Sequence, residues 1–194
     1  MKSRASVAIL LAAGFCVSAF LQAQNKTNAT EKPFVSGGKI DMRLDGGSYE
    51  IRAAAGNQIR VTLSGNTGNA KIDLGTNGSH ADVKVTDTPH NNFQATIEVP
   101  KAADLVVRLT GGNLVIAAIT GNKDVESYGG NVQIAVGDPN EYASVDAAVK
   151  AGDIHANVFG GSKSGLLQQF TWSGHGKYTL RAHLGAGNLE LGTK

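Results

Sequence analysis

The stretch Thr110–Val136 reads TGGNLVIAAITGNKDVESYGGNVQIAV, and within it a Gly-Asn pair recurs every nine residues. The pairs are Gly112-Asn113, Gly121-Asn122 and Gly130-Asn131. Aliphatic residues follow the glycines at the second and fourth positions, and only Lys123 breaks this rule. A strand of roughly six residues spans about 20 Å, which leaves about three residues of each unit for a tight turn at glycine. The spacing therefore predicts short strands separated by turns.

The same punctuation continues on both sides of this stretch. From Lys39 to Leu63, apolar residues alternate with charged ones, a period typical of half-buried strands. The glycines that bound these segments are again nine residues apart, at Gly38, Gly47, Gly56 and Gly65. No long window has a helical period, and residues 141–150 come closest. The sequence predicts an almost entirely β protein.

Two architectures are compatible with this pattern. The constant spacing favours a β-helix-like or β-solenoid stack of short strands in glycine-punctuated units of about nine residues, because hairpins tolerate more variation in length than stacked rungs do. An antiparallel meander or sandwich remains open for the N-terminal part, where the alternation suits either arrangement. We expect a solenoid stack in the second half of the chain.

The N-terminus has the features of a secretory signal peptide. A basic start precedes an apolar run that ends near Leu21, and cleavage is expected after Ala23, with Ala19 as the alternative. No later apolar segment is long enough to span a membrane. We therefore predict a signal peptide at 1–23, a disordered polar spacer at 24–33 and a single β-repeat domain at 34–194, exported to the periplasm, the cell surface or the medium.

The charge balance argues against general electrostatic partners. The formal net charge is +2, but loss of Lys2 and Arg4 with the signal peptide leaves 16 basic and 16 acidic residues. A neutral chain has little electrostatic attraction for nucleic acid or anionic lipid. Export argues against nucleic acid as well. The expected partner is an envelope protein or a glycan, and the sequence does not indicate an oligomeric state.

Metal and cofactor sites are not expected. The calcium-binding β-roll pattern Gly-Gly-x-Gly-x-Asp, started at Gly111, requires glycine and aspartate where the chain has Leu114 and Ile116. Zinc sites need closely spaced histidines or cysteines. The histidines have no such spacing and lie at His80, His90, His155, His175 and His183.

Catalytic residues are not expected either. Hydrolysis of a polysaccharide needs two carboxylates at a fixed separation. Here the acidic residues of the first strands alternate with basic ones, which favours cross-strand ion pairs. These residues are Lys39, Asp41, Arg43, Asp45, Glu50 and Arg52. The segment Gly161–Gly165 has the wrong register for a nucleophile elbow. We interpret the protein as non-enzymatic.

One aromatic cluster is a candidate ligand site. Residues 170–178, FTWSGHGKY, contain Phe170, Trp172 and Tyr178, and Trp172 is the only tryptophan of the chain. Exposed on one face, such rings would stack on the apolar faces of sugars. The alternative is that they cover the open end of the hydrophobic core.

Several segments together resemble the bacterial putative-adhesin family, a group of glycine-rich β-repeat proteins of the cell envelope. The matching segments are FVSGGKI at 34–40, IEVP at 97–100 with ADLVV at 103–107, the repeated Gly-Asn units, and GAGNLEL at 185–191. The resemblance covers nearly all of the chain after the signal peptide. It implies a β-helix-like domain that faces the envelope or exterior as an adhesin or interaction module, and it supplies no catalytic residues. A small carbohydrate-binding or carbohydrate-active protein is the alternative.

Overall fold

The computed structural model describes residues 28–193, which form one mixed sheet of thirteen strands. The prediction of an all-β chain is confirmed, and the described residues contain no α-helix. The strands are β1 (Ala29–Pro33), β2 (Lys39–Leu44), β3 (Gly47–Ala53), β4 (Gln58–Gly65), β5 (Lys71–Asn77), β6 (His80–Thr86), β7 (Phe93–Val99), β8 (Asp104–Leu109), β9 (Gly112–Ile116), β10 (Lys123–Ala135), β11 (Tyr142–Ala156), β12 (Gly161–Ser173) and β13 (Tyr178–Gly192). Two short 3-10 helices, η1 (Pro139–Glu141) and η2 (Asn157–Phe159), flank β11.

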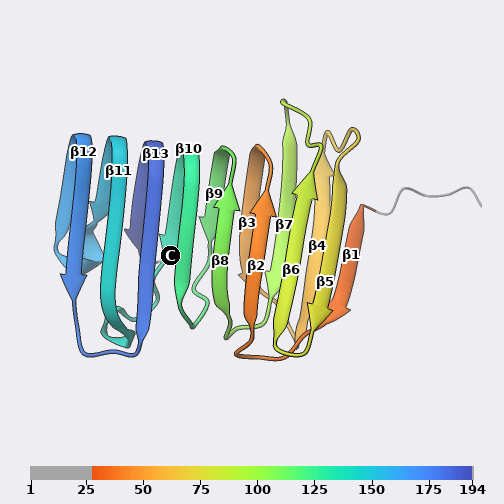
Figure 1. The fold of residues 1–194 in the computed structure, drawn as a ribbon, viewed down its shortest axis with the longest axis horizontal. Helices are drawn as coiled ribbons and strands as arrows, with labels where there is room; N and C mark the ends of the chain where they lie inside the picture. The colour runs from red at the N-terminus through yellow and green to blue at the C-terminus, as the bar shows by residue number, and fades with distance from the viewer. Residues whose placement is uncertain (1–27, 194) are drawn as a thin grey trace, which may run out of the picture.

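The sheet folds back on itself into two facing layers (Figure 1). One layer, the back layer, follows the order β1-β4-β7-β3-β9, and the front layer follows β8-β2-β6-β5. β10 belongs to both, because residues 123–127 pair with β8 and residues 130–134 pair with β9. β13 and β11 extend both layers, and β12 ends the sheet as the antiparallel partner of β11. The result is a nearly closed, barrel-like sheet.

Glycines mark the line where the long strands bend from one layer into the other. Five of them are in-register neighbours on adjacent strands, and we call them the glycine column: Gly47, Gly112, Gly130, Gly187 and Gly152. At Gly130, φ is +112°, and a Cβ atom would lie closer than 3.0 Å to the carbonyl oxygen of Gly112. Only glycine permits this backbone conformation and this approach. Gly121 lies at the opposite end of the strands, before β10, so Gly112 and Gly130, which are neighbours in the column, are two nine-residue units apart in the sequence.

The structure does not show the predicted β-helix or solenoid. Consecutive units of a solenoid stack on one another, whereas β3 lies between β7 and β9, and β10 pairs with β13 instead of β11. The parallel, in-register pairing of glycine-bounded units is present, but the order is not sequential. Antiparallel pairing occurs at the ends of the sheet, in β1–β4, β4–β7, β5–β6 and β11–β12. The nine-residue spacing thus reflects strand length and does not encode which strands become neighbours.

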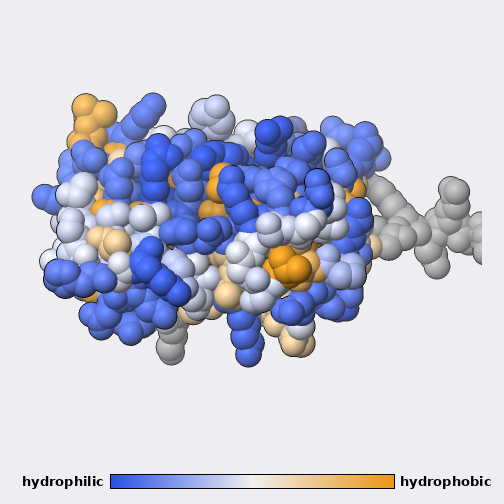
Figure 2. All heavy atoms as spheres, turned by 60° about the horizontal axis from the view of Figure 1, so that its bottom comes forward, coloured by the Kyte–Doolittle hydropathy of each residue, from blue (hydrophilic) through white to orange (hydrophobic). Residues whose placement is uncertain are grey.

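The hydrophobic core lies between the two layers. Strand alternation places every second side chain inward, as in β7, where Phe93, Ala95, Ile97 and Val99 are at most 3% exposed. Full burial of one such large aliphatic or aromatic side chain stabilises the fold by about 1.5–3 kcal/mol. The outward positions are mostly polar, and hydrophilic residues predominate on the face seen in Figure 2. Functional groups are therefore to be sought on the outer faces of the two layers.

The first described residues correct the predicted domain limits. Residues 29–33 were expected to belong to a disordered spacer, but they form β1 and pair with β4, where the Arg60 guanidinium binds the Glu31 carboxylate. The predicted signal peptide and residues 24–27 lie outside the described residues. Between residues 28 and 193 there is no helix with the length and apolar character needed to cross a membrane.

Candidate functional site

The three aromatic residues predicted to bind a ligand lie near the β12 end of the sheet. Phe170 and Trp172 on β12 and Tyr178 on β13 are half-buried and pack against the core. The ring centroids of Trp172 and Phe159 are 4.9 Å apart. The rings of Tyr178 and Tyr142 meet edge-on, with 6.4 Å between their centroids. We call these five residues the aromatic end. Their packing agrees with a role in covering the core, and ligand binding by them stays a prediction.

A buried lysine contacts the aromatic end from inside. Lys123 is 1% exposed, and its Nζ donates hydrogen bonds to the Ile119 carbonyl oxygen at 2.6 Å and to the Tyr142 hydroxyl at 2.7 Å. Burial lowers the pKa of Lys123 to about 8, although the charges of Glu141 and Asp104 oppose this shift. A lysine with a low pKa is a potential nucleophile, but this one is closed to solvent. We assign it a structural role, in which it satisfies buried acceptors.

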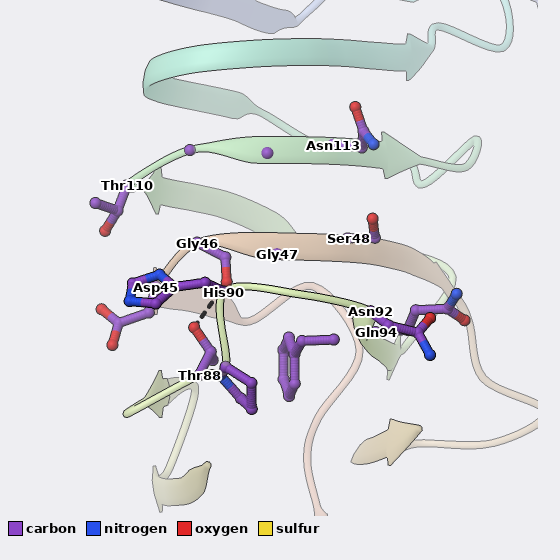
Figure 3. Close-up of a pocket in the computed structure, with 14 residues that line it drawn as sticks. Asp45, Gly46, Gly47, Ser48, Thr88, His90, Asn92, Gln94, Thr110 and Asn113 are labelled. Carbon is purple, nitrogen blue, oxygen red and sulfur yellow. Dashed lines mark hydrogen bonds between the residues drawn. The ribbon is translucent and has the colours of Figure 1, made fainter. Parts of the chain in front are cut away.

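A pocket of about 650 Å³ lies at the corner between β2 and β3 (Figure 3). The loop 87–92 borders it, because the Thr88 hydroxyl donates to the Gly46 carbonyl oxygen at 2.7 Å and the Asp87 amide donates to the Asp45 carboxylate at 2.9 Å. Its polar side chains, labelled in Figure 3, are Asp45, Ser48, Thr88, His90, Asn92, Gln94, Thr110 and Asn113. Hydroxyls and amides predominate, so this pocket suits a neutral polar group.

A ladder of asparagines runs from this pocket along the outer face of the back layer. The Asn131 side-chain amide donates to the Asn113 oxygen at 3.1 Å, and the Asn188 amide donates to the Asn131 oxygen at 3.0 Å. Each asparagine directly follows a glycine of the column. The pairs Gly112-Asn113 and Gly130-Asn131 thus combine a bend with a cross-strand hydrogen bond. Asn122, at the other end of the strands, binds the Asp104 carboxylate instead.

A larger hollow of about 790 Å³ crosses the outer face of the front layer, and we call it the front groove. It adjoins the corner pocket, since Asp45 and Thr110 line both. Its lining comes from six neighbouring strands or the residues that directly follow them: Lys84 and Thr86 of β6; Arg43, Leu44 and Asp45 of β2; Arg108, Leu109 and Thr110 of β8; Glu126, Ser127 and Tyr128 of β10; His183, Leu184 and Gly185 of β13; and Lys150 of β11. The hollow therefore runs across the strands.

An ion-pair network occupies the middle of the front layer. Asp124 is bound by Arg108 at 2.9 Å and by Arg181 at 3.1 Å, and both guanidinium groups also bind Glu126. Burial raises the pKa of the Asp124 carboxyl, but the two arginines outweigh it and hold this pKa below its usual value. His183 continues the network to Asp146 at 3.0 Å. The carboxylates beside the groove are thus engaged by cations.

One side of the front groove differs from the middle of the layer in its charge, because three cationic side chains are adjacent there. Lys84, Arg43 and Arg108 occupy in-register positions on β6, β2 and β8, and we call them the basic row. Arg43 has no ion-pair partner among residues 28–193, and Lys84 has only Asp73, at 3.9 Å. Like charges on directly opposed positions destabilise a sheet. Arg108 is paired with Asp124 and Glu126, so the uncompensated positive charge of this row lies at Arg43 and, apart from the long contact with Asp73, at Lys84.

The acidic residues that the sequence analysis examined as possible catalytic groups do not share one site. Asp41 lies 3.4 Å from the Lys39 amine, and Arg52 binds Glu98 at 3.1 Å. Glu50 has no ion-pair partner within the described part of the chain. In that part, no three or more His, Cys, Asp or Glu side chains lie close enough together to hold a metal ion. The corner pocket and the front groove therefore join the aromatic end as candidate ligand sites.

Sequence reasoning missed the basic row and Tyr128. The three cations are far apart in the chain, and only the strand register brings them together. Tyr128 is 83% exposed at an outward position of β10 and lines the front groove. Its signal was an aromatic residue at a polar position of the alternation, directly before Gly129-Gly130.

Comparison with known proteins finds similarity at the level of structure alone. No protein-family model matches the chain, and no curated protein matches it. Among solved structures, the chain is similar to a crystal structure described as a putative cell adhesion protein from Clostridium sporogenes, with 14% sequence identity and a TM-score of 0.48. The similarity covers 84% of this chain and 98% of the other. A likeness of this size assigns neither a family nor a function to the chain.

Proposed function

We propose that the protein is an exported, non-enzymatic binding domain that acts as an adhesion or interaction module of the cell envelope, and that it binds through the front groove. The observation that carries this proposal is the shape of the groove, which crosses six neighbouring strands of a layer in which the side chains are held in register. An elongated hollow that is lined by both polar and apolar side chains suits an extended ligand. Export rests on the signal sequence predicted at 1–23.

The ion pairs in the groove support binding over catalysis. A glycosidase holds one carboxylic acid and one carboxylate on either side of the bond that it cleaves. Both oxygens of the Glu126 carboxylate are bound by guanidinium groups, one of Arg108 and one of Arg181. Asp45, at the edge of the groove, accepts a hydrogen bond from the Asp87 amide. These two acidic residues are the ones that line the groove, and both are already bound by neighbouring groups of the protein.

A binding assay with a turnover control tests this function. The chain from Gln24 onward is immobilised and exposed to purified envelope glycans and envelope proteins, and recovered polymers are sized. We expect a bound partner of unchanged length, with binding weakened about tenfold by Tyr128→Ala. Leu166→Ala is the matched control, because this exposed residue lies outside the groove. Recovery of shortened polymer would show that the protein is an enzyme. Unchanged binding by Tyr128→Ala would show that the front groove is not the binding site.

The aromatic end is the second candidate, as a carbohydrate site formed by Phe170, Trp172 and Tyr178. Its support is that all three rings keep part of their surface exposed. Against it, the Trp172 ring packs on Phe159, and the Lys177 amine lies over the Tyr178 ring at 4.6 Å. Trp172 fluorescence tests this site directly. A spectrum that does not change across a glycan panel eliminates it.

A further inference from the structure

The front groove has the length of an extended polymer segment. Strands in a sheet lie about 4.8 Å apart, so a hollow that spans six strands is roughly 24 Å long. The strand order across it is β6-β2-β8-β10-β13-β11, without interruption. An extended chain laid across these strands would meet one side chain per strand. The groove therefore favours a linear polymer over a compact small molecule.

The charges of the groove favour an anionic polymer. Arg43 in the basic row and Lys150 at the far end have no ion-pair partner within residues 28–193, and Lys84 has only the weak contact with Asp73. Neither acidic lining residue forms an ion pair with these cations, because Glu126 is bound by two arginines of the network and Asp45 accepts a hydrogen bond from the Asp87 amide. Cations that no carboxylate neutralises are free to bind anionic groups of a ligand.

An exposed tyrosine adds a surface for a ring. Tyr128 is 83% exposed and lies in the groove between the basic row and Lys150, on β10. Thr86 and Thr110 add hydroxyl groups to the same lining. Aromatic faces stack on the apolar faces of sugar rings, and hydroxyls bind their polar edges. A nucleic acid would require a larger cationic surface than these few side chains offer on a nearly neutral chain.

We propose that the front groove binds an acidic polysaccharide, with anionic groups on Lys84, Arg43 and Lys150 and a sugar ring on Tyr128. This inference rests on the proposed function, because it names the ligand class of the same groove. The ion-pair network keeps the central arginines in place beneath the ligand. Carboxylate and sulfate groups share the chemistry that these cations recognise.

Matched polymers separate the contributions of charge and sugar. Binding of the chain from Gln24 onward to dextran sulfate and to polygalacturonate is compared with binding to neutral dextran, at two salt concentrations. We expect binding of the acidic polymers only, weaker at high salt. The variant Arg43→Gln/Lys84→Gln should lose about tenfold or more in affinity and depend less on salt. The control Lys101→Gln/Lys163→Gln removes the same charge from exposed positions outside the groove and should bind like the wild type.

The outcomes test the proposed ligand class and the proposed function separately. Failure to bind either acidic polymer, or equal loss in the control variant, overturns the acidic class. Binding of a neutral glycan that Tyr128→Ala abolishes and the charge variant leaves intact also overturns it, while the proposed function stands. Tighter binding of polyphosphate than of both polysaccharides, with the same dependence on Arg43 and Lys84, makes phosphate the ligand group and rejects the sugar. If no groove variant affects any bound partner, the proposed function fails as well.

Discussion

The glycine column and the aromatic end stabilise the same sheet in opposite ways. In the column, adjacent backbones approach so closely that a Cβ at Gly130, Gly187 or Gly152 would collide with a neighbouring carbonyl oxygen. At the aromatic end, the sheet has no further strand to pair with, and rings such as Trp172 on Phe159 cover the core. One region depends on the absence of side chains and the other on large ones. The glycines of the column therefore allow the sheet to fold over, and the aromatic residues cover the core where the sheet ends.

A methyl group in the column should have the largest effect. Gly130→Ala introduces a Cβ against the Gly112 carbonyl at φ +112°, where non-glycine residues are strained. We expect a loss of about 4 kcal/mol or more in the free energy of unfolding, or no folded protein. Chemical denaturation followed by circular dichroism measures it. Gly56→Ala is the control, because Gly56 is exposed with open space around it, and its change should stay within about 0.5 kcal/mol. Equal effects would show that the column is not special.

Truncation at the aromatic end should cost less. Trp172→Ala removes the ring that packs on Phe159, and because Trp172 is only half-buried we expect a loss of about 2–3 kcal/mol, at or below the lower end for large aromatic deletions. Leu166→Ala on the same strand changes a residue that is 75% exposed and should be nearly neutral. Urea denaturation of both variants gives the comparison. Unchanged stability of Trp172→Ala would contradict the covering role and strengthen the case for a ligand site.

The buried lysine should make stability depend on alkaline pH. The pKa of Lys123 is about 8 in the fold and 10.5 ordinarily, so between these values the unfolded chain holds a proton that the folded chain has lost. The contribution of Lys123 to stability is therefore lowest below pH 8, and it rises by up to about 1.4 kcal/mol per pH unit above it. Tyr142, whose pKa is raised by burial, sets the upper limit of the window, because an ordinary tyrosine begins to ionise near pH 10.

The control for the lysine is Lys123→Met, which keeps the length of the side chain and removes the titrating group. Urea denaturation from roughly pH 7 to pH 9.5 should give a rising free energy for the wild type and a flatter profile for the variant. Absolute stability is not the criterion, since methionine leaves the Ile119 carbonyl and the Tyr142 hydroxyl without their donor. Parallel profiles would show that the lysine titrates alike in the folded and unfolded chain.

The sequence predicts the strands and their bends well, but it predicts the order of the strands in the sheet poorly. Alternation identifies inward residues such as Ile40 and Val132, and glycine identifies the bends. The sequence does not predict which strands become neighbours in the sheet, because most units have the same pattern of glycine and aliphatic residues and could pair in several orders. β1 pairs with β4 through contacts such as Glu31–Arg60, which no local pattern indicates. The front groove could not be predicted from the sequence for the same reason, since Lys84, Arg43 and Arg108 become adjacent only through the register of β6, β2 and β8.

Substitutions in the asparagine ladder should have the smallest effect on the free energy of unfolding. Asn131→Ala removes the two side-chain hydrogen bonds to Asn113 and Asn188 while leaving Gly130 beside it unchanged. Because these bonds lie on an exposed face, where water replaces them, we expect a loss of about 1 kcal/mol or less. Asn113→Ala removes one of the two bonds and should cost about half as much. Thermal melts of the two variants measure the difference. A loss as large as that of Trp172→Ala would mean that the ladder, and not the bend alone, holds the paired strands in register, so that the asparagine would be needed for the fold as well as the glycine in the pairs Gly112-Asn113, Gly130-Asn131 and Gly187-Asn188.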